Sequence, residues 1–250
     1  MGGSTVNIRR MEMTGRMYGI GVGPGDPGLL TLKAKEILDT CDVIAYPVKR
    51  SGEESTALEI IRPSVDFTGR DIREFVFSMS PDDDDWKAGH DDAILGICAL
   101  LKEGKSVAMV TLGDVGVYST FMYIKEAIEE NGYDVEIVPG IPSFCHGAAL
   151  AGLPLVLNNE GLAIVPVAKE NSELLSAAMD VFDNIVVMKA FKSISKISDM
   201  MESKGISNDA ATVISNVGMS DQYIGPLDKT RNYSYFTTVI IKKNHGKEAH

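Results

Sequence analysis

Short apolar runs alternate with segments of helical spacing through the first half of the chain, and no other feature limits the fold so strongly. Strands are predicted at 18–22, 42–46, 105–112 and 134–138. Helical spacing is carried by Leu30, Ala34, Ile37, Leu38 and Cys41, then by Ile94, Ile97, Cys98 and Leu101, then by Phe121, Ile124 and Ile128. Such alternation is typical of a largely parallel sheet with helices on both faces. The predicted class is therefore α/β.

The pattern changes after residue 139, where prolines become frequent. Strands are predicted at 162–165, 185–188, 211–216 and 235–242, with one clear helix marked by Ile194, Ile197 and Met201. Because 218–234 has no helical period, a mixed sheet with an antiparallel part fits best. We expect a disordered leader at 1–16, an N-terminal α/β domain at 17–140, a C-terminal α/β domain at 141–243 and a tail at 244–250.

Composition excludes several classes of protein. The chain has 250 residues, a net charge of −11 and three cysteines. An odd, sparse set of cysteines argues against a disulfide framework and for the cytoplasm. No apolar run approaches the roughly 20 residues of a membrane-spanning helix, and nucleic acid would need a basic face. No metal is expected, because the adjacent Cys145 and His146 point apart on a helix and no Cys-x-x-Cys pair exists.

The first glycine-rich loop, at 21–28, follows a predicted strand and precedes a helix. A dinucleotide-binding fingerprint would need glycine at its sixth position, where Asp26 stands. A carboxylate there would repel a pyrophosphate, and Pro24 removes one amide that could hold a phosphate. The loop therefore disfavours a dinucleotide site. The alternative interpretation is a structural turn between strand and helix. Such a turn would not need so many glycines, so it leaves the loop partly unexplained.

Two further loops follow predicted strands. The second loop, at 111–120, carries Asp114, Tyr118, Ser119 and Thr120 beside two glycines. The third loop, at 139–144, contains Ser143, which is expected to cap the helix that begins there. Ligands bind at the carboxyl ends of strands in open α/β sheets, so we predict ligand binding at these loops.

In this order and spacing the three loops resemble the tetrapyrrole (corrin/porphyrin) methylase family. The shared pattern is Gly-x-Gly-Pro-Gly-Asp-Pro at 21–27, Leu-Leu-Thr at 29–31, Gly-Asp at 113–114 and Pro-Gly-Ile-x-Ser at 139–143, followed by Met-Lys at 188–189 and an aromatic-hydroxyl-apolar strand at 235–241. The resemblance covers 17 to about 243. Val115 departs from it, because the family usually has proline there. Tyr46-Pro47 and 113–120 look most like the branch that methylates carbon 20 of precorrin-2, with or without cobalt.

The resemblance implies two α/β domains with S-adenosyl-L-methionine in the cleft between them, S-adenosyl-L-homocysteine as the product, and a homodimer. Carried over residue by residue, the cofactor-binding positions are Pro24, Leu112, Gly113, Asp114, Val117, Tyr118, Ser119, Thr120, Ser143, Phe144, Met188, Val217 and Thr237. It also implies that Pro24 and Asp26 face the substrate.

Methyl transfer from a sulfonium is an in-line displacement, so the protein mainly positions the reactants. Asp26, Asp114 and Tyr118 are candidates for a base that removes a proton from the substrate. The resemblance favours cofactor binding for Asp114, which leaves Asp26 and Tyr118 as predicted catalytic residues.

A tetrapyrrole substrate carries several carboxylates, whereas this chain is acidic. Binding therefore requires a local basic rim, and we predict Lys33, Lys49, Arg50 and Lys189 for it. Two alternatives stay open. One is a methylase of the same family acting on another precorrin carbon or on a modified protein residue. The other is a nucleotide-binding oxidoreductase or an adenosyl-ligand sensor, and the missing sixth glycine disfavours the oxidoreductase.

Overall fold

The computed structural model describes residues 15–77, 83–167 and 172–243. The chain folds into two compact units. The first comprises the described residues up to Val22 together with Leu30–Gly140, and the second comprises Gly23–Leu29 together with the described residues from Ile141 onward. Residues 23–28 of the first loop therefore leave the N-terminal domain to which the sequence assigns them, whereas Gly21 and Val22 stay in it. Most of the predicted leader and all of the predicted tail lie outside the described residues.

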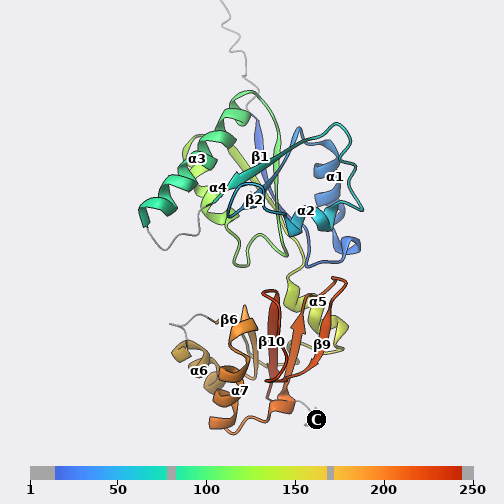
Figure 1. The fold of residues 1–250 in the computed structure, drawn as a ribbon, viewed down its shortest axis with the longest axis vertical. Coiled ribbons are helices and arrows are strands. Elements are labelled where there is room, and N and C mark those ends of the chain that lie inside the picture. Colours follow the sequence, from blue (N-terminus) through green and yellow to red (C-terminus); the bar gives the residue numbers. More distant parts are fainter. Residues whose placement is uncertain (1–14, 78–82, 168–171, 244–250) are drawn as a thin grey trace, which may run out of the picture. The chain divides into compact units, whose positions relative to one another are not determined.

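The first unit is built on a parallel five-stranded sheet (Figure 1). Its strands are β1 (Arg16–Gly21), β2 (Val43–Val48), β3 (Asp71–Val76), β4 (Val107–Thr111) and β5 (Asp134–Val138), in the order β3-β2-β4-β1-β5. All four described pairings are parallel, which confirms the predicted α/β class. The sequence did not predict β3, an edge strand whose Asp71, Arg73 and Glu74 give it no apolar run.

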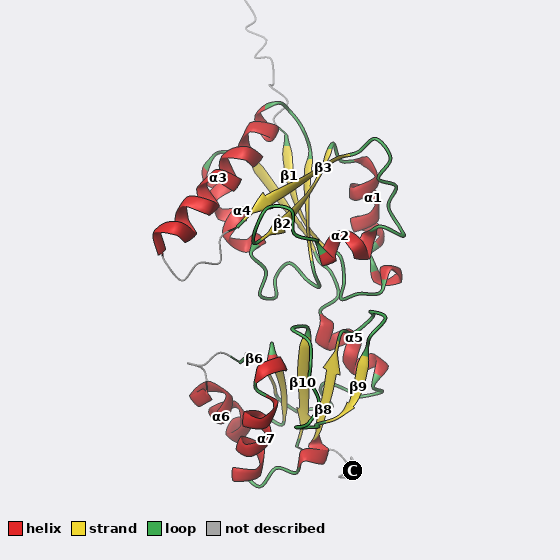
Figure 2. Ribbon diagram, viewed as in Figure 1, coloured by secondary structure: helices red, strands yellow, loops and turns green. Residues whose placement is uncertain are grey.

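Helices cover both faces of this sheet, as Figure 2 shows. Helices α1 (Leu32–Thr40) and α2 (Thr56–Ile61) pack on the face that includes Ile20. Helices α3 (Asp83–Lys102) and α4 (Phe121–Glu130) pack on the face that includes Met17. Because successive strand residues point to opposite faces, a strand buried on both sides is nearly apolar throughout. All five residues of β4 are buried, and only Thr111 at its end is polar. Helix α2 is an addition to the predicted elements.

The second unit contains a mixed sheet, as expected. Its strands are β6 (Leu162–Pro166), β7 (Asn184–Met188), β8 (Ala211–Ser215), β9 (Tyr223–Pro226) and β10 (Thr237–Lys242), in the order β6-β7-β10-β8-β9. Only β6 and β7 pair in parallel among these described strands. Helices α6 (Ser172–Val181) and α7 (Ile194–Ser203) cover one face. On the other, α5 (Ser143–Leu150) brings Gly147 against Ile214. The sequence did not predict α6 or β9.

No helix within the described ranges is both long enough and apolar enough to cross a membrane.

One close contact in the first unit sets the distance between α4 and the sheet. Phe121 is 2% exposed, and a Cβ added to Gly19 of β1 would lie 2.6 Å from Phe121 Cδ1. Any side chain at residue 19 would therefore overlap the phenyl ring. Glycine lets Phe121, the first residue of α4, rest directly on the strand.

We predict that Gly19→Ala lowers the free energy of unfolding by roughly 1–3 kcal/mol, the usual cost of overpacking a filled core. Adding Phe121→Leu should recover part of this loss, because the smaller side chain leaves room for the new methyl group. Urea unfolding of the single and double variants checks both statements. A Gly19→Ala protein with the midpoint of the wild type would show that α4 shifts outward without cost.

Candidate functional site

The connections of the first sheet mark one place for a ligand. Strands β1 and β4 are neighbours. The helix after β1, α1, lies on one face of the sheet, whereas the helix after β4, α4, lies on the other. Loops that leave adjacent strands toward opposite faces form the topological switch point at which open α/β sheets bind ligands. The first and second loops both begin here, and the third follows the adjacent strand β5.

The three loops meet at Gly21, Gly113 and Gly140, which we call the glycine junction. A Cβ on Gly21 would lie 2.5 Å from Gly140 N and 2.8 Å from Gly113 O. A Cβ on Gly140 would overlap Gly113 O and lie 2.7 Å from the carbonyl carbon of Gly21. Gly113 also has φ 72°, a left-handed conformation that favours glycine. The junction thus accounts for the first glycine of the first loop, which a plain turn left unexplained.

Asp114 joins the second loop to the third. Its Oδ1 accepts a hydrogen bond from Gly116 N at 2.8 Å, and its Oδ2 accepts one from Gly140 N at 2.9 Å. The first bond closes a turn within the second loop, and the second crosses to the glycine junction. Each carboxylate oxygen keeps a further lone pair, so direct cofactor binding by Asp114 stays a prediction beside this observed role.

The hydroxyl groups of the second loop divide into two kinds. Ser119 Oγ lies 3.0 Å from Thr111 Oγ1 and accepts a hydrogen bond from Phe121 N at 3.2 Å. Ser119 thus helps to start α4. Thr120 occupies the N-cap position of α4, but its side chain makes no capping hydrogen bond. The hydroxyl of Ser119 therefore supports the start of the helix, whereas the hydroxyl of Thr120 does not cap it.

Tyr118 is 48% exposed, and partial burial raises the pKa of its phenol above the ordinary value. A phenol whose pKa is raised stays protonated at neutral pH, which favours it as a hydrogen-bond donor and disfavours it as a base. Val115, the residue in place of the family's proline, is fully buried in the core beneath this loop.

Left-handed backbone conformations occur at or next to several predicted cofactor positions in the sequence. The non-glycine residues with positive φ among those described are Tyr118 (52°), Asn158 (47°), Lys189 (58°) and Asn216 (51°). The first belongs to the second loop, the third follows Met188 and the last precedes Val217; only Asn158 lies apart from these positions in the sequence. Such conformations cost free energy and tend to cluster at functional sites. Asn216 is a residue that the sequence did not single out.

In the second unit, the first loop packs against the turn after β8. A Cβ on Gly25 would overlap Val217 O, and a Cβ on Gly218 would lie 2.5 Å from Asp26 N. Asp26 is exposed, and its Oδ1 accepts a hydrogen bond from Gly28 N at 2.8 Å. Residues 23–29, which include Pro24 and Asp26, thus belong with Val217 in the second unit.

Three more predicted cofactor residues share one end of the second sheet. Met188 ends β7, Val217 follows β8 and Thr237 begins β10. Since β10 is antiparallel to both of its neighbours, its first residue lies beside the last residues of β7 and β8, at the same end of the sheet. Thr237 Oγ1 donates a hydrogen bond to Ser234 O at 2.6 Å, and Val217 and Thr237 are buried.

Helix α5 supplies Ser143 and the buried Phe144. The expectation that Ser143 caps this helix is wrong: Pro142 occupies the N-cap position, and Ser143 is the first helical residue. The carbonyl of Pro142 accepts hydrogen bonds from Cys145 N at 3.1 Å and His146 N at 3.3 Å. Its ring fixes the extended backbone that enters the helix, with φ −64°. The hydroxyl of Ser143 therefore does not have to close the helix end.

Of the predicted basic residues, two lie against carboxylates. Lys33 Nζ is 2.5 Å from Glu136 Oε1, and Arg50 Nε is 3.0 Å from Glu53 Oε1. Lys49 is also tied to Glu53, through its backbone N at 3.2 Å from Oε2. Lys189 is exposed at the carboxyl end of β7. The first three belong to the first unit and Lys189 to the second.

An aromatic cluster, which the sequence did not predict, adjoins Lys189. The rings of Phe191 and Tyr235 have centroids 5.4 Å apart, and those of Tyr235 and Phe236 are 5.5 Å apart. Lys192 Nζ lies 5.3 Å from the centroid of Phe191. Strand β10 begins at Thr237 rather than at residue 235. The two aromatic residues that looked like the start of a strand therefore precede it, and both are partly exposed.

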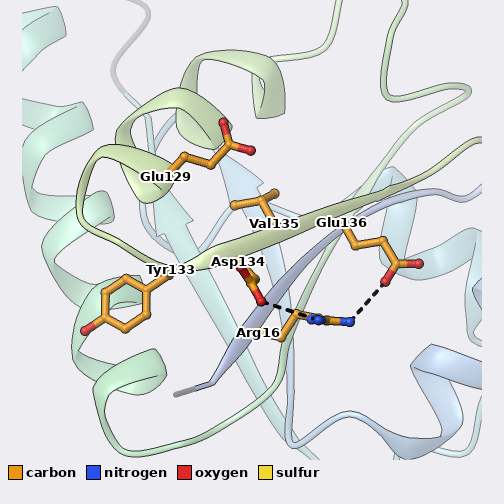
Figure 3. A pocket seen from close by; sticks show the side chains of 6 residues that line it. All are labelled: Arg16, Glu129, Tyr133, Asp134, Val135 and Glu136. Atoms are coloured by element: carbon orange, nitrogen blue, oxygen red, sulfur yellow. Dashed lines mark hydrogen bonds and ion pairs between the residues drawn. The ribbon is translucent and has the colours of Figure 1, made fainter. Parts of the chain in front are cut away.

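A pocket of about 410 Å³ lies at the other end of the first sheet. Figure 3 shows Arg16 reaching toward Asp134 and Glu136, at 3.4 Å and 3.6 Å respectively. Arg16 and Asp134 begin β1 and β5, so this pocket is remote from the carboxyl ends that carry the loops. Glu129 adds a third carboxylate to its lining, which makes the pocket unsuited to a polyanion.

Comparison with known proteins agrees with this arrangement of loops. Residues 16–229 match the model of the tetrapyrrole (corrin/porphyrin) methylases. The chain belongs to this family. This methylase is 41% identical over 187 residues to the probable cobalt-precorrin-2 C(20)-methyltransferase of Methanocaldococcus jannaschii, covering 75% of the chain and 77% of the relative.

Two further comparisons cover nearly the whole methylase. It is 29% identical over 237 residues to the cobalt-precorrin-2 C(20)-methyltransferase of Salmonella typhimurium, covering 92% of the chain and 98% of the relative. Its fold is similar to the solved uroporphyrin-III C-methyltransferase of Thermus thermophilus in complex with S-adenosyl homocysteine. That comparison has a TM-score of 0.65 and 20% identity, over 92% of the chain and 98% of the solved structure.

We predict that Asp114→Ala lowers the free energy of unfolding by about 1.5–3 kcal/mol, because two backbone N–H groups lose a charged acceptor. Asp66→Ala is the matched control. Asp66 accepts a hydrogen bond from Thr68 N at 2.9 Å in a similar turn, but no described bond carries it to another loop. Chemical denaturation should show a clearly smaller loss for the control. Equal losses in the two variants would mean that the bond to Gly140 contributes nothing.

Proposed function

We propose that this methylase transfers a methyl group from S-adenosyl-L-methionine to carbon 20 of precorrin-2 or cobalt-precorrin-2, within cobalamin biosynthesis. The observation that carries the proposal is the 41% identity over 187 residues to a relative named for this reaction on cobalt-precorrin-2. The similar name of the Salmonella relative, which aligns over 92% of the chain, supports the same substrate.

The residues present suit the adenosyl cofactor. In the first unit, the glycine junction brings the backbones of the three loops together, and Leu112 and Val117 add apolar surface. In the second unit, Phe144, Met188 and Val217 are apolar and Thr237 is polar. A mostly apolar lining with a few placed polar groups is typical of cofactor sites. When bound, the cofactor supplies an activated methyl group on a positively charged sulfur and leaves as S-adenosyl-L-homocysteine.

The residues of this chain position the substrate and accept its proton. We assign the base to Asp26, because its carboxylate is exposed and only Oδ1 is needed to hold the turn with Gly28. The phenol of Tyr118, whose pKa burial raises, stays protonated and donates a hydrogen bond instead. Positioning is the main contribution, since the methyl donor is already reactive.

Local cations hold the carboxylates of the substrate against the net charge of −11. Arg50 and Lys49 lie on the loop after β2, whose Gly52 N donates a hydrogen bond to Glu74 Oε2 at 2.9 Å. Glu53, which binds Arg50, competes with the substrate for that guanidinium. In the second unit, Lys189 lies beside the aromatic cluster, so cations and apolar rings together match an apolar macrocycle that bears carboxylates.

The cofactor assignment predicts that the protein binds S-adenosyl-L-homocysteine with a micromolar dissociation constant, about −8 kcal/mol. Isothermal titration calorimetry measures this directly, with NAD as the control ligand. Incubation with labelled S-adenosyl-L-methionine and precorrin-2, with and without cobalt, should add one methyl group, which mass analysis and NMR locate at carbon 20. Binding of NAD alone, or methylation at another carbon, would contradict the proposal.

The rim assignment predicts opposite effects from two neighbouring changes. Replacing Lys49 and Arg50 together by alanine should raise the KM for the tetrapyrrole and flatten its dependence on salt, because exposed charges are screened within a Debye length of about 3 Å at 1 M. Glu53→Gln should lower that KM, because it removes the competitor for Arg50. Steady-state kinetics from low to high salt test both variants. A double variant with the KM of the wild type at every salt concentration would remove this loop from the rim.

We further propose that the enzyme is a cytoplasmic homodimer. The family resemblance supports the dimer, and the three cysteines, none of which forms a disulfide in the described structure, are consistent with a reducing compartment. Light scattering coupled to size-exclusion chromatography measures the mass, which is 27.0 kDa for one chain.

A further inference from the structure

Asn216 stands where several segments of the second unit meet. It is 7% exposed and directly follows Ser215, the last residue of β8. Its Nδ2 donates a hydrogen bond to Asp221 Oδ2 at 2.5 Å, and its Oδ1 accepts one from Ser234 Oγ. Both ends of the side-chain amide are therefore used, one toward the β8–β9 connection and one toward the segment that leads into β10.

The backbone of Asn216 makes two more connections. Its N donates a hydrogen bond to Phe236 O at 3.0 Å, and its O accepts one from Met219 N at 3.0 Å. The residue has φ 51°, a left-handed conformation that asparagine tolerates better than most side chains. The chain therefore reverses sharply here, and the side chain holds the reversal in place.

The residues held by this turn are those assigned to the cofactor and the substrate. Val217 follows Asn216 directly, and Gly218 lies so close to Asp26 N that a Cβ there would be 2.5 Å away. Ser234, which binds the side chain, also accepts a hydrogen bond from Thr237 Oγ1 through its carbonyl at 2.6 Å. One side chain thus connects Val217, Thr237 and the first loop.

We infer that Asn216 is a positioning residue of this methylase: it sets the turn that presents Val217 to the cofactor and supports the loop that carries Asp26. The inference rests on the proposed function, because it concerns the same site. Asn216 itself need not touch either reactant.

The first test separates the side chain from the backbone conformation. Glycine adopts positive φ without strain, so Asn216→Gly removes only the amide and its two hydrogen bonds. The matched control is Asn158→Gly, since Asn158 also has positive φ, 47°, but is exposed. Titration calorimetry with S-adenosyl-L-homocysteine should show binding weakened about tenfold or more in Asn216→Gly, because small misplacements at a site are costly. The control should bind as the wild type does.

A second pair of variants keeps the test decisive if Asn216→Gly fails to fold. Asn216→Asp places a carboxylate against Asp221 and should weaken binding, whereas Asn216→Asp with Asp221→Asn exchanges donor and acceptor and should restore it. A residue that only stabilised the fold would change the melting temperature without this loss and rescue of affinity. Unchanged affinity in the single variants, or a double variant as weak as Asn216→Asp, would overturn the inference and leave the proposed function intact. Failure of the wild type to bind the ligand would overturn both.

Discussion

The candidate site depends on the contact between three stretches of backbone at Gly21, Gly113 and Gly140. No side chain fits among them, since a Cβ on Gly21 would lie 2.5 Å from Gly140 N. The loops after β1, β4 and β5 can therefore converge at one edge of the parallel sheet. Asp114 secures the convergence by accepting hydrogen bonds from Gly116 and Gly140. Loops packed this closely have little room to rearrange, and preorganisation of this kind lets an enzyme position reactants without ordering loops on binding.

The second unit combines close-packed glycines, Gly25 and Gly218, with a network of polar side chains. Its sheet is antiparallel around β10, so the ends of β7, β8 and β10 meet at one edge. The connections there are held by the amide of Asn216 and the hydroxyls of Ser215, Ser234 and Thr237. Buried polar groups must be satisfied, and a network in which each member has a partner specifies one arrangement of the backbone. The cost is a left-handed asparagine at the turn.

The net charge of the chain says less about the binding of an anionic ligand than its individual ion pairs do. A net charge of −11 opposes binding of a polycarboxylate as a whole. In the structure, Lys33 and Arg50 each lie against a glutamate. An exposed ion pair is worth little in free energy, so an incoming carboxylate can replace the glutamate at small cost. Under the proposed function, the acidic residues would make substrate binding weaker and more selective, because the substrate would have to present its carboxylates where the cations lie.

The sequence by itself determined the α/β class, the parallel and mixed sheets and the family, because strand and helix periodicity and the order of glycine loops are local properties of the chain. It missed β3, whose charged residues hide the strand, and β9, which is only four residues long. Only the tertiary structure decided which unit each loop packs in and which residues its side chains contact. Residues 23–29 join the second unit, Asp114 binds Gly140 as well as its own loop, and Asn216 binds Ser234 in the segment that leads into β10. These contacts join separate segments of the chain, and no local pattern records which partner a carboxylate or an amide will meet.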